Sequence, residues 1–405
     1  MKNHKISHSW VVVGAALVIL TVAFSIQTSF GVFIKPLQDS FGWSRATTSW
    51  AITVHLLIYA LFLIPAGWAI DRFNMGVVFS VAAGLIAFAL VLCSRISEPW
   101  QLYLLYGLPL GIGIAICGPP ILGVLTRWFA QRRGTALGIA ATGTGFGTLL
   151  GAPIANALIG VYGWQGAFLI FGIAGSIILL ICAYIVRGPA RPTELETKAM
   201  GSDSQGRANP LPRPSMGFAQ ALKTPQMRLL VITQFFAIFT TRVVPVHIVP
   251  HAIDMGISPS VAALSLATIG AFSVVGRLSM GVVQDKIGPR YSMIICLFLQ
   301  VAAMVALPFI GTEAPLFVFA AVFGYTWGGD VPQIPAMTAQ CFGLASVGVL
   351  YAAVMMVGNV SGSISAILAG YIFDVTGSYT VIFLAAAAGL LVGIFCIWRL
   401  KLPEN

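Results

Sequence analysis

The stretch WVVVGAALVILTVAFSIQTSFGVFI, residues 10–34, decides the class of fold that this chain adopts. It contains no charged residue, and a membrane-spanning helix needs about 20 mostly apolar residues. The whole chain has the same character, because 58% of its 405 residues are hydrophobic and 8% are charged. Soluble globular proteins are roughly half apolar and a quarter charged. The composition therefore excludes a soluble fold.

Apolar runs of this kind recur along the chain and predict an all-α membrane protein with twelve transmembrane helices. Strands of a membrane barrel alternate apolar and polar residues over about ten positions, whereas these runs are longer and apolar on all sides. The expected spans are residues 10–34, 46–70, 76–94, 100–126, 134–160, 165–186, 227–251, 260–283, 290–311, 315–338, 346–373 and 379–398.

A polar stretch at residues 187–226 interrupts the series after the sixth span. It is rich in proline and has no core-forming pattern, which is typical of a linker. We therefore predict an N-terminal six-helix bundle at residues 1–186, a cytoplasmic linker at 187–226 and a C-terminal six-helix bundle at 227–405.

The net charge of +10 indicates orientation in a membrane and not binding to nucleic acid, because the basic residues lie mostly in short gaps between apolar runs. With the N-terminus inside, most of the 22 Lys and Arg residues fall on the inner side, and Lys35, Arg45 and Arg95 fall outside. This positive-inside bias places both termini in the cytoplasm. We expect the lipid bilayer as a partner, no nucleic acid, and a monomer. The six cysteines lie within or at the ends of apolar runs and are expected to be small core residues.

Three motifs of the first half recur in the second at nearly constant spacing, which predicts an internal repeat. They are Gly67-x-x-x-Asp71-Arg72 with Gly281-x-x-x-Asp285-Lys286, Gly143-x-x-x-Gly147 with Gly358-x-x-x-Gly362, and Pro119 with Pro332. Transporters built from such repeats bind their substrate near the bilayer midplane, between the halves.

The six-plus-six plan and the Gly-x-x-x-Asp-Arg/Lys pair resemble the major facilitator superfamily. Two longer strings, FGVFIKPLQDSFGWSR at Phe30–Arg45 and WFAQRRGTALGIAATGTGFG at Trp128–Gly147, are similar to signatures of the monocarboxylate porter branch and of the neighbouring oxalate–formate antiporter branch. The resemblance is to bacterial monocarboxylate porters. It implies the major facilitator fold with two pseudo-symmetric bundles, no cofactor, and a place in the bacterial inner membrane.

The chain departs from those branches at three positions. Animal-type monocarboxylate porters carry a Lys in span 1, where this chain has Thr28, and an Asp four residues before the span 8 Arg, where it has Ser273. The oxalate exchangers carry a Lys in span 11, and residues 346–373 contain none.

Arg277 in span 8 matches the carboxylate-binding Arg of the family. A planar guanidinium can hold a carboxylate through two parallel hydrogen bonds. The alternative is a side chain that snorkels to the nearby end of the span. Asp330 in span 10 lies at a similar depth, so we expect it to replace the missing carboxylate, pair with Arg277 and carry the proton. The alternative for Asp330 is a static ion pair between two helices.

His247 and His251 lie four residues apart on span 7. This spacing can hold a metal, but Pro250 disturbs the turn and no third ligand is evident, so we expect no metal site. His247 is a candidate hydrogen-bond donor to the substrate, and His251 is expected to be solvated. The other candidate binding residues are Gln27, Thr28, Cys117, Asn359 and Arg242. The alternative for the uncharged members is a hydrogen bond to a neighbouring helix. For Arg242 the alternatives are a structural pair with Asp254 and solvation in the outer vestibule.

Asp71, Arg72, Asp285 and Lys286 face the cytoplasm, where such charges bridge helix ends in this superfamily. Arg132 and Arg133 are candidate partners in that gate; the alternative is contact with anionic lipid. The glycine-rich string at residues 143–147 resembles a dinucleotide-binding loop in sequence. No strand is expected before it, so close packing between helices is the better interpretation.

We therefore expect a secondary transporter, not an enzyme, that moves a small lactate- or pyruvate-like monocarboxylate with a proton by alternating access. The alternative within this fold is an organic-anion exchanger of the oxalate–formate type, with Arg242 and Arg277 as a two-point clamp. A membrane-embedded enzyme would need a nucleophile–base pair or a metal cluster, and neither GxSxG nor HExxH occurs in the sequence.

Overall fold

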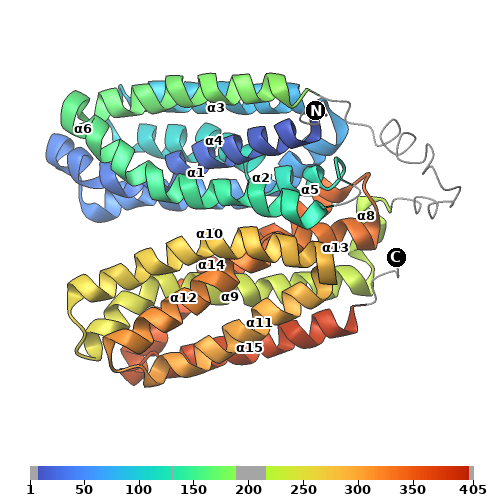
Figure 1. Ribbon diagram of the computed structural model, residues 1–405. Coiled ribbons are helices and arrows are strands. Elements are labelled where there is room, and N and C mark those ends of the chain that lie inside the picture. The colour runs from blue at the N-terminus through green and yellow to red at the C-terminus, as the bar shows by residue number, and fades with distance from the viewer. Residues whose placement is uncertain (1–7, 130–131, 188–215, 401–405) are drawn as a thin grey trace, which may run out of the picture. The chain divides into compact units, whose positions relative to one another are not determined.

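The computed structural model describes residues 8–129, 132–187 and 216–400. Within these ranges every regular element is helical (Figure 1). Helix beginnings carry the expected signals: Thr224, for example, accepts a hydrogen bond from the Met227 amide at 3.2 Å and precedes a proline at the first helical position.

The first half of the chain forms six helices, of which the last is the longest. They are α1 His8–Phe41, α2 Arg45–Arg72, α3 Met75–Cys93, α4 Pro99–Cys117, α5 Pro120–Leu125 and α6 Arg133–Ile185. The 53 residues of α6 contain both the fifth and the sixth predicted spans. They are separated at Gly163, whose φ of 68° is one that glycine adopts without steric cost.

The second half repeats this plan with more interruptions. Its elements are α8 Phe218–Leu222, α9 Pro225–Asp254, α10 Pro259–Ile287, α11 Pro289–Ala306, η1 Leu307–Phe309, α12 Glu313–Asp330, α13 Gln333–Phe342, α14 Val347–Thr376 and α15 Thr380–Arg399. The tenth predicted span is divided at Val331 and Pro332 into α12 and α13. Pro119, the repeat mate of Pro332, divides α4 from α5 in the same way.

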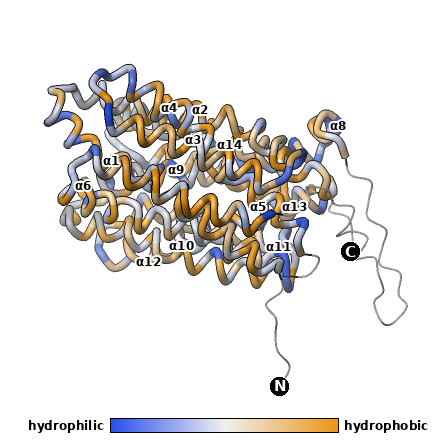
Figure 2. Tube along the Cα trace, turned by 90° about the horizontal axis from the view of Figure 1, so that it is seen from above, coloured by the Kyte–Doolittle hydropathy of each residue, from blue (hydrophilic) through white to orange (hydrophobic). Residues whose placement is uncertain are grey.

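Ten segments of the described residues are long and apolar enough to cross a membrane. Two of the twelve predicted spans account for the difference, because α6 holds two spans and the broken α12–α13 segment is not among the ten. Figure 2 shows apolar residues along most of each helix and hydrophilic residues at the helix ends. The all-α membrane fold predicted from the sequence is confirmed.

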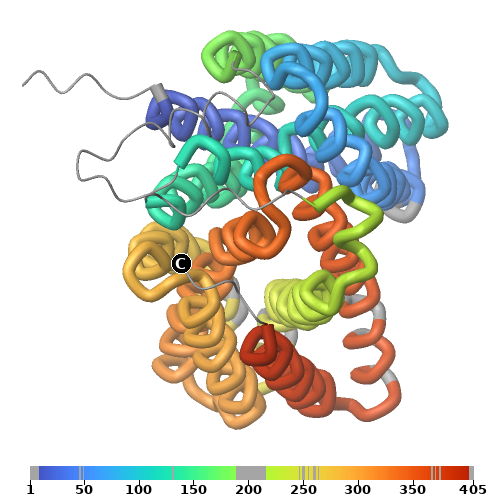
Figure 3. Tube along the Cα trace, turned by 90° about the vertical axis from the view of Figure 1, so that its right-hand side faces the viewer, coloured from blue at the N-terminus to red at the C-terminus, as the bar shows by residue number. Residues whose placement is uncertain are grey.

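The chain forms two compact units, whose helices are seen end-on in Figure 3. Unit 1 contains residues 1–130, 139–214 and 344–352, and unit 2 contains residues 131–138, 215–343 and 353–405. The beginning of α6 therefore belongs to unit 2, and the beginning of α14 belongs to unit 1. Most of the predicted linker lies outside the described residues, and its last part contains α8.

Glycines of α6 allow that helix to pack closely against α1 within unit 1. A Cβ atom at Gly147 would lie 2.6 Å from the Thr21 carbonyl oxygen, and one at Gly151 would lie 2.5 Å from the Ser25 carbonyl oxygen. The Ser25 hydroxyl donates to the Gly147 carbonyl at 3.1 Å across the same contact. The glycine string is thus a helix-packing surface, as the sequence indicated.

Candidate functional site

Close packing between α10 and α12 in unit 2 brings Arg277 and Asp330 into one region. Cβ atoms at Gly276 and Gly328 would overlap the carbonyl oxygens of Tyr325 and Ser273 respectively. The two helices therefore touch through their backbones, as small residues permit in membrane helices.

Arg277 is buried, with 5% of its surface exposed. Its Nη1 atom donates to the Ser273 hydroxyl at 2.8 Å, and its buried Nε atom has no hydrogen-bond partner among the described residues. Ser273 lies one turn earlier on the same helix, so this partner of the guanidinium is a neutral hydroxyl and not a carboxylate. An unpaired donor on a buried cation is costly unless an anionic ligand satisfies it.

Asp330 is the last residue of α12 and is 9% exposed. It interacts electrostatically with Arg277, but the two side chains do not form an ion pair within 4 Å in the described part of unit 2. The expected direct ion pair is therefore not formed among the described residues, and Arg277 donates to the Ser273 hydroxyl.

Gln333, which the sequence analysis did not single out, is the first residue of α13 and directly follows the interruption between α12 and α13. Its amide Nε2 donates to the Gly329 carbonyl at 2.9 Å, which satisfies a backbone acceptor near the interrupted helix. Its Oε1 atom is buried and accepts no hydrogen bond from the described residues. Gln333 therefore adds a buried, unsatisfied acceptor three residues after Asp330.

The two histidines of α9 are both buried, at 8% exposed for His247 and 7% for His251. The His247 ring lies 5.0 Å from the ring of Tyr379. His251 was expected to be solvated, and this was wrong: its Nε2 lies 3.3 Å from the Leu307 carbonyl oxygen, and its ring packs against Phe383. Among the described residues no group of three metal-ligating side chains occurs.

The remaining candidate binding residues differ in their hydrogen-bond partners and in their burial. The Thr28 hydroxyl donates to the Phe24 carbonyl at 2.7 Å, and the Asn359 amide donates to the Met355 carbonyl at 2.8 Å, so both bond their own helix. Cys117 is fully buried in unit 1. Arg242 is exposed and belongs to α9 of unit 2.

Gln27 has a partner that the sequence analysis missed. Its Nε2 lies 3.3 Å from the Nε2 of His55, a fully buried residue of α2. The signal for His55 was available, because an ionisable residue inside an apolar span such as 46–70 is costly and usually functional.

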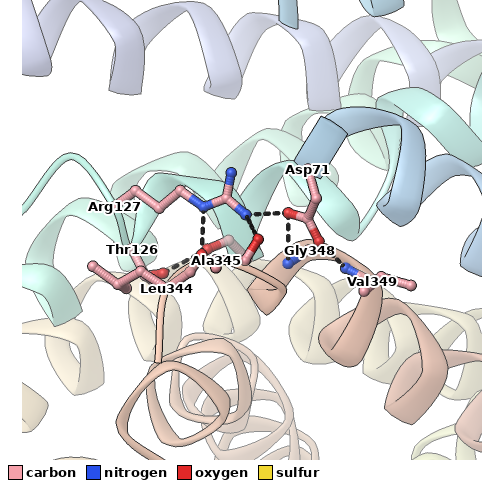
Figure 4. A network of polar contacts seen from close by, with 8 residues as sticks. Asp71, Thr126, Arg127, Leu344, Ala345, Gly348 and Val349 are labelled. Carbon is pink, nitrogen blue, oxygen red and sulfur yellow. Dashed lines mark hydrogen bonds and ion pairs between the residues drawn. The ribbon is translucent and has the colours of Figure 1, made fainter. Parts of the chain in front are cut away.

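The two acidic motifs of the internal repeat lie at the ends of α2 and α10. In unit 1, Asp71 at the end of α2 accepts hydrogen bonds from the Gly348 amide at 3.1 Å and the Val349 amide at 2.7 Å (Figure 4). These amides open α14 and have no partner inside the helix. An anion is favoured there by the helix dipole as well.

A guanidinium completes the contact in unit 1. Arg127 pairs with Asp71 and also donates to the Leu344 carbonyl at 2.7 Å and the Ala345 carbonyl at 2.9 Å (Figure 4). The sequence analysis did not single out Arg127. The candidates named instead lie elsewhere: the Arg72 guanidinium stacks over Trp68, and Arg132 and Lys286 are exposed.

Unit 2 contains the repeat mate of this contact. Asp285 of α10 accepts hydrogen bonds from the Gly134 amide at 2.6 Å and from the Thr135 amide at 2.9 Å, at the beginning of α6. Arg133, a predicted gate residue, is the half-buried first residue of α6. Asp71, Gly134 and Thr135 are each 214 residues from their counterparts Asp285, Gly348 and Val349. The internal repeat inferred from sequence therefore extends to matching hydrogen bonds.

The chain belongs to the major facilitator superfamily, whose family model matches residues 15–311 and 230–405. It is 30% identical to monocarboxylate transporter 13 of Rattus norvegicus over 387 residues, which cover 95% of this chain and 87% of that protein. It is also 30% identical to monocarboxylate transporter 11 of Mus musculus, over 95% of this chain and 86% of the relative.

Solved structures show the same fold at low sequence identity. The fold matches FucP, a major facilitator superfamily transporter crystallised in the outward conformation, with a TM-score of 0.73 at 15% identity over 98% of this chain and all of FucP. A double Trp mutant of XylE matches with a TM-score of 0.71 at 16% identity, over 98% of this chain and 97% of that structure.

The class of the protein follows from these findings: it is an integral membrane transporter and not an enzyme. Its relatives named above are mammalian monocarboxylate transporters. They agree with the monocarboxylate resemblance, and they give no support to the oxalate–formate alternative or to a bacterial source.

Proposed function

We propose that this protein moves a small monocarboxylate, such as lactate or pyruvate, together with a proton by alternating access. The observation that carries the proposal is the buried Arg277 guanidinium with its unpartnered Nε donor. The names of the relatives add support for the class of substrate, since both are monocarboxylate transporters.

Arg277 binds the substrate carboxylate in this proposal. Its Nη1 bond to Ser273 is a single hydrogen bond to a neutral hydroxyl, whereas a carboxylate is charged and can accept two parallel hydrogen bonds from the guanidinium. A carboxylate therefore competes well for the guanidinium. His247, buried in the same unit, is a second donor for the substrate, and Arg242 attracts the anion before it enters.

Asp330 carries the proton. The charge of Arg277 favours an ionised carboxylate at Asp330, and a bound substrate anion neutralises that charge. Substrate and proton then bind together, so the gradient of one can drive the other. The chain has no nucleotide-binding GxxxxGK[ST] string that would supply another energy source.

The two capped helix beginnings serve as gates. We propose that the amides of Gly348 and Val349 leave Asp71, and those of Gly134 and Thr135 leave Asp285, in another state of the transport cycle. The positive-inside bias supports a cytoplasmic location for both gates and both termini. The proposal of a bacterial inner membrane rests only on the resemblance of the two sequence strings at Phe30–Arg45 and Trp128–Gly147 to bacterial porters.

Uptake of labelled acids into proteoliposomes, with and without an imposed pH gradient, tests the proposal. We expect Arg277→Ala to abolish uptake and Arg277→Lys to retain a small part of it, because Lys keeps the charge but loses the fork geometry. Arg95→Ala is the matched control, since Arg95 is exposed and outside the site. Uptake by Arg277→Ala at the wild-type rate would overturn the proposal.

The role of Asp330 has its own test. We expect Asp330→Asn to exchange labelled for unlabelled acid across the vesicle but to lose accumulation driven by the pH gradient. An Asp330→Asn protein that still accumulates the acid against its gradient would exclude Asp330 as the proton carrier.

A further inference from the structure

Two buried side chains around Asp330 in unit 2 each keep one hydrogen-bonding atom without a partner among the described residues. One atom is the Arg277 Nε, which is a donor, and the other is the Gln333 Oε1, which is an acceptor. Gln333 is fully buried, and its Nε2 donates to the carbonyl oxygens of Gly329 at 2.9 Å and of Met280 in α10 at 3.4 Å. An unpaired acceptor in an apolar interior is costly, so a donor beside Oε1 would be stabilising.

The backbone places Gln333 on the same side of its helix as Asp330. Val331 has φ −58° and ψ −46°, and Pro332 has φ −73° and ψ −13°, so the chain from residue 330 to residue 333 makes about one helical turn. Residues three apart on a helix are neighbours on its surface. The Gln333 side chain also extends back to the Gly329 carbonyl, which directly precedes Asp330. Its Oε1 atom is therefore within reach of the Asp330 carboxyl.

Arg277 and Asp330 start from neighbouring backbone positions, because a Cβ atom at Gly276 would lie 3.0 Å from the Gly329 amide nitrogen. Among the described residues, the charged and titratable groups that interact with Asp330 are Arg277 of α10 and the Cys296 thiol of α11, a weak donor. α13 adds no charged residue. The Asp330 carboxyl forms no hydrogen bond with the described residues, and its oxygens are not among the enclosed unpaired atoms. It can therefore exchange a proton with water.

The two unpaired atoms suit the two forms of this carboxyl group. An ionised carboxylate only accepts hydrogen bonds, so the Arg277 guanidinium is a suitable partner for it. A protonated carboxyl carries an O–H donor, which needs an acceptor in an apolar interior. A guanidinium has no acceptor, whereas Gln333 Oε1 is one. Each protonation state of Asp330 therefore has its own buried partner.

We propose that Gln333 is a positioning residue that stabilises the protonated form of Asp330 by accepting the hydrogen of its carboxyl group at Oε1. This inference rests on the proposed function, in which Asp330 carries the proton. The proton comes from water, so an O–H bond forms at Asp330 as one breaks in hydronium, and the proton returns to water on release. Neutral Asp330 no longer attracts the guanidinium, which leaves Arg277 free for the substrate carboxylate. Proton and acid therefore favour each other's binding reciprocally.

The pH dependence of lactate uptake into proteoliposomes tests the role of Gln333. Gln333→Met keeps the length of the side chain and removes the acceptor. Because the protonated carboxyl then loses its partner, we expect the proton concentration for half-maximal uptake to rise about three- to tenfold, the range of one neutral hydrogen bond. Half-maximal uptake thus moves to lower pH. An unchanged midpoint in Gln333→Met, where Asp330→Asn abolishes the pH dependence, overturns the inference.

Gln284→Met is the matched control. Gln284 is also a buried glutamine of unit 2 whose Oε1 has no partner among the described residues, but it lies next to Asp285 near the end of α10. Its replacement should change the melting temperature in detergent and leave the pH of half-maximal uptake at the wild-type value. A shift as large as that of Gln333→Met would overturn a specific role for Gln333.

Melting temperatures separate the acceptor at Oε1 from the structural bonds of Nε2. They are measured at acidic and at alkaline pH for the wild type, Gln333→Met, Asp330→Asn and the double variant. The Nε2 bonds are lost at both pH values, so only the Oε1 bond makes the loss depend on pH. We expect Gln333→Met to lower the melting temperature more at acidic pH, where Asp330 is protonated. In the Asp330→Asn background the loss should be equal at both pH values, because an Asn amide always donates.

The outcomes distinguish this inference from the proposed function. An equal loss at both pH values in the wild-type background overturns the inference and leaves the proposed function intact. Uptake that requires Arg277 but still accumulates the acid in Asp330→Asn overturns both the proton-carrying role of Asp330 and this inference. Absence of any monocarboxylate uptake overturns the proposed function, while a pH-dependent loss in Gln333→Met would still support the bond between Gln333 and Asp330.

Discussion

The two acidic helix caps occupy equivalent positions of the repeat but differ in their surroundings. Asp71 and its partner Arg127 have side chains that are 8% and 7% exposed, whereas Asp285 is exposed. Asp71 bonds two amides of α14 and a guanidinium, and Asp285 bonds two amides of α6 and the Thr135 hydroxyl at 2.5 Å.

Both helix beginnings therefore have a carboxylate in the same position, but the groups that compensate for its burial differ between the two units. Two backbone donors are sufficient for an exposed carboxylate, because water satisfies its remaining lone pairs. A buried carboxylate needs more, since removing it from water costs several kcal/mol unless its charge is paired. Arg127 supplies that charge in unit 1. The unit 1 contact should therefore depend strongly on each partner, and the unit 2 contact only weakly.

Asp71→Ala has the largest expected effect, because it leaves the buried Arg127 guanidinium without its carboxylate. Breaking a buried pair from one side costs about 3–5 kcal/mol. We expect a lower melting temperature in detergent and a loss of most transport. The control is Asp39→Ala, since Asp39 is an exposed carboxylate near the end of α1. Equal melting temperatures for the two variants would show that the Asp71 contact does not stabilise the protein.

Replacing both partners should cost less than replacing one. The double variant Asp71→Asn, Arg127→Met removes both charges, and Asn keeps an oxygen that can accept from the amides of Gly348 and Val349. We expect it to recover at least about 1 kcal/mol relative to Arg127→Met alone, which leaves a buried carboxylate unpaired. Additive losses of stability in the double-mutant cycle would contradict a coupled pair.

The fold could be predicted from the sequence because the length of an apolar run is itself the determinant of a membrane helix. Pro332 marks the point at which the tenth predicted span divides into two helices, and Gly163 marks the boundary between the two spans within α6. The position of Arg277 as a buried group was predictable, since a charged residue inside a span is rarely exposed to lipid.

The partners of the site residues were not predictable, because position along a helix gives depth but not neighbours. Arg277 and Asp330 were placed at similar depths, yet Ser273 lies one turn from Arg277 on the same face and takes its hydrogen bond. Arg127 resembled any other basic residue at the inner end of a span. His251, near the outer end of its span, is enclosed by Leu307 and Phe383, which are distant in sequence.

Asp285→Ala should have a much smaller effect than Asp71→Ala. It removes an exposed anion from the beginning of α6, and such helix-terminus interactions contribute about 0.5–1 kcal/mol. We expect a small decrease in melting temperature that shrinks as salt is raised, because exposed charges are screened. The loss caused by Asp71→Ala should not depend on salt in this way. A salt-independent loss for Asp285→Ala as large as that of Asp71→Ala would remove the distinction between the two caps.

Thr135→Val should have the smallest effect of the series. It removes only the hydroxyl that donates to Asp285 and keeps the Thr135 amide bond at 2.9 Å, while the shape of the side chain is nearly unchanged. Because Asp285 is exposed, water can replace the lost donor, and we expect a change within about 0.5 kcal/mol. Val349→Thr is the reciprocal variant, since it gives the unit 1 cap the hydroxyl that the unit 2 cap has. A loss above about 1 kcal/mol for Thr135→Val would mean that the unit 2 contact is stabilised by its hydroxyl and is as specialised as the contact of Asp71 with Arg127.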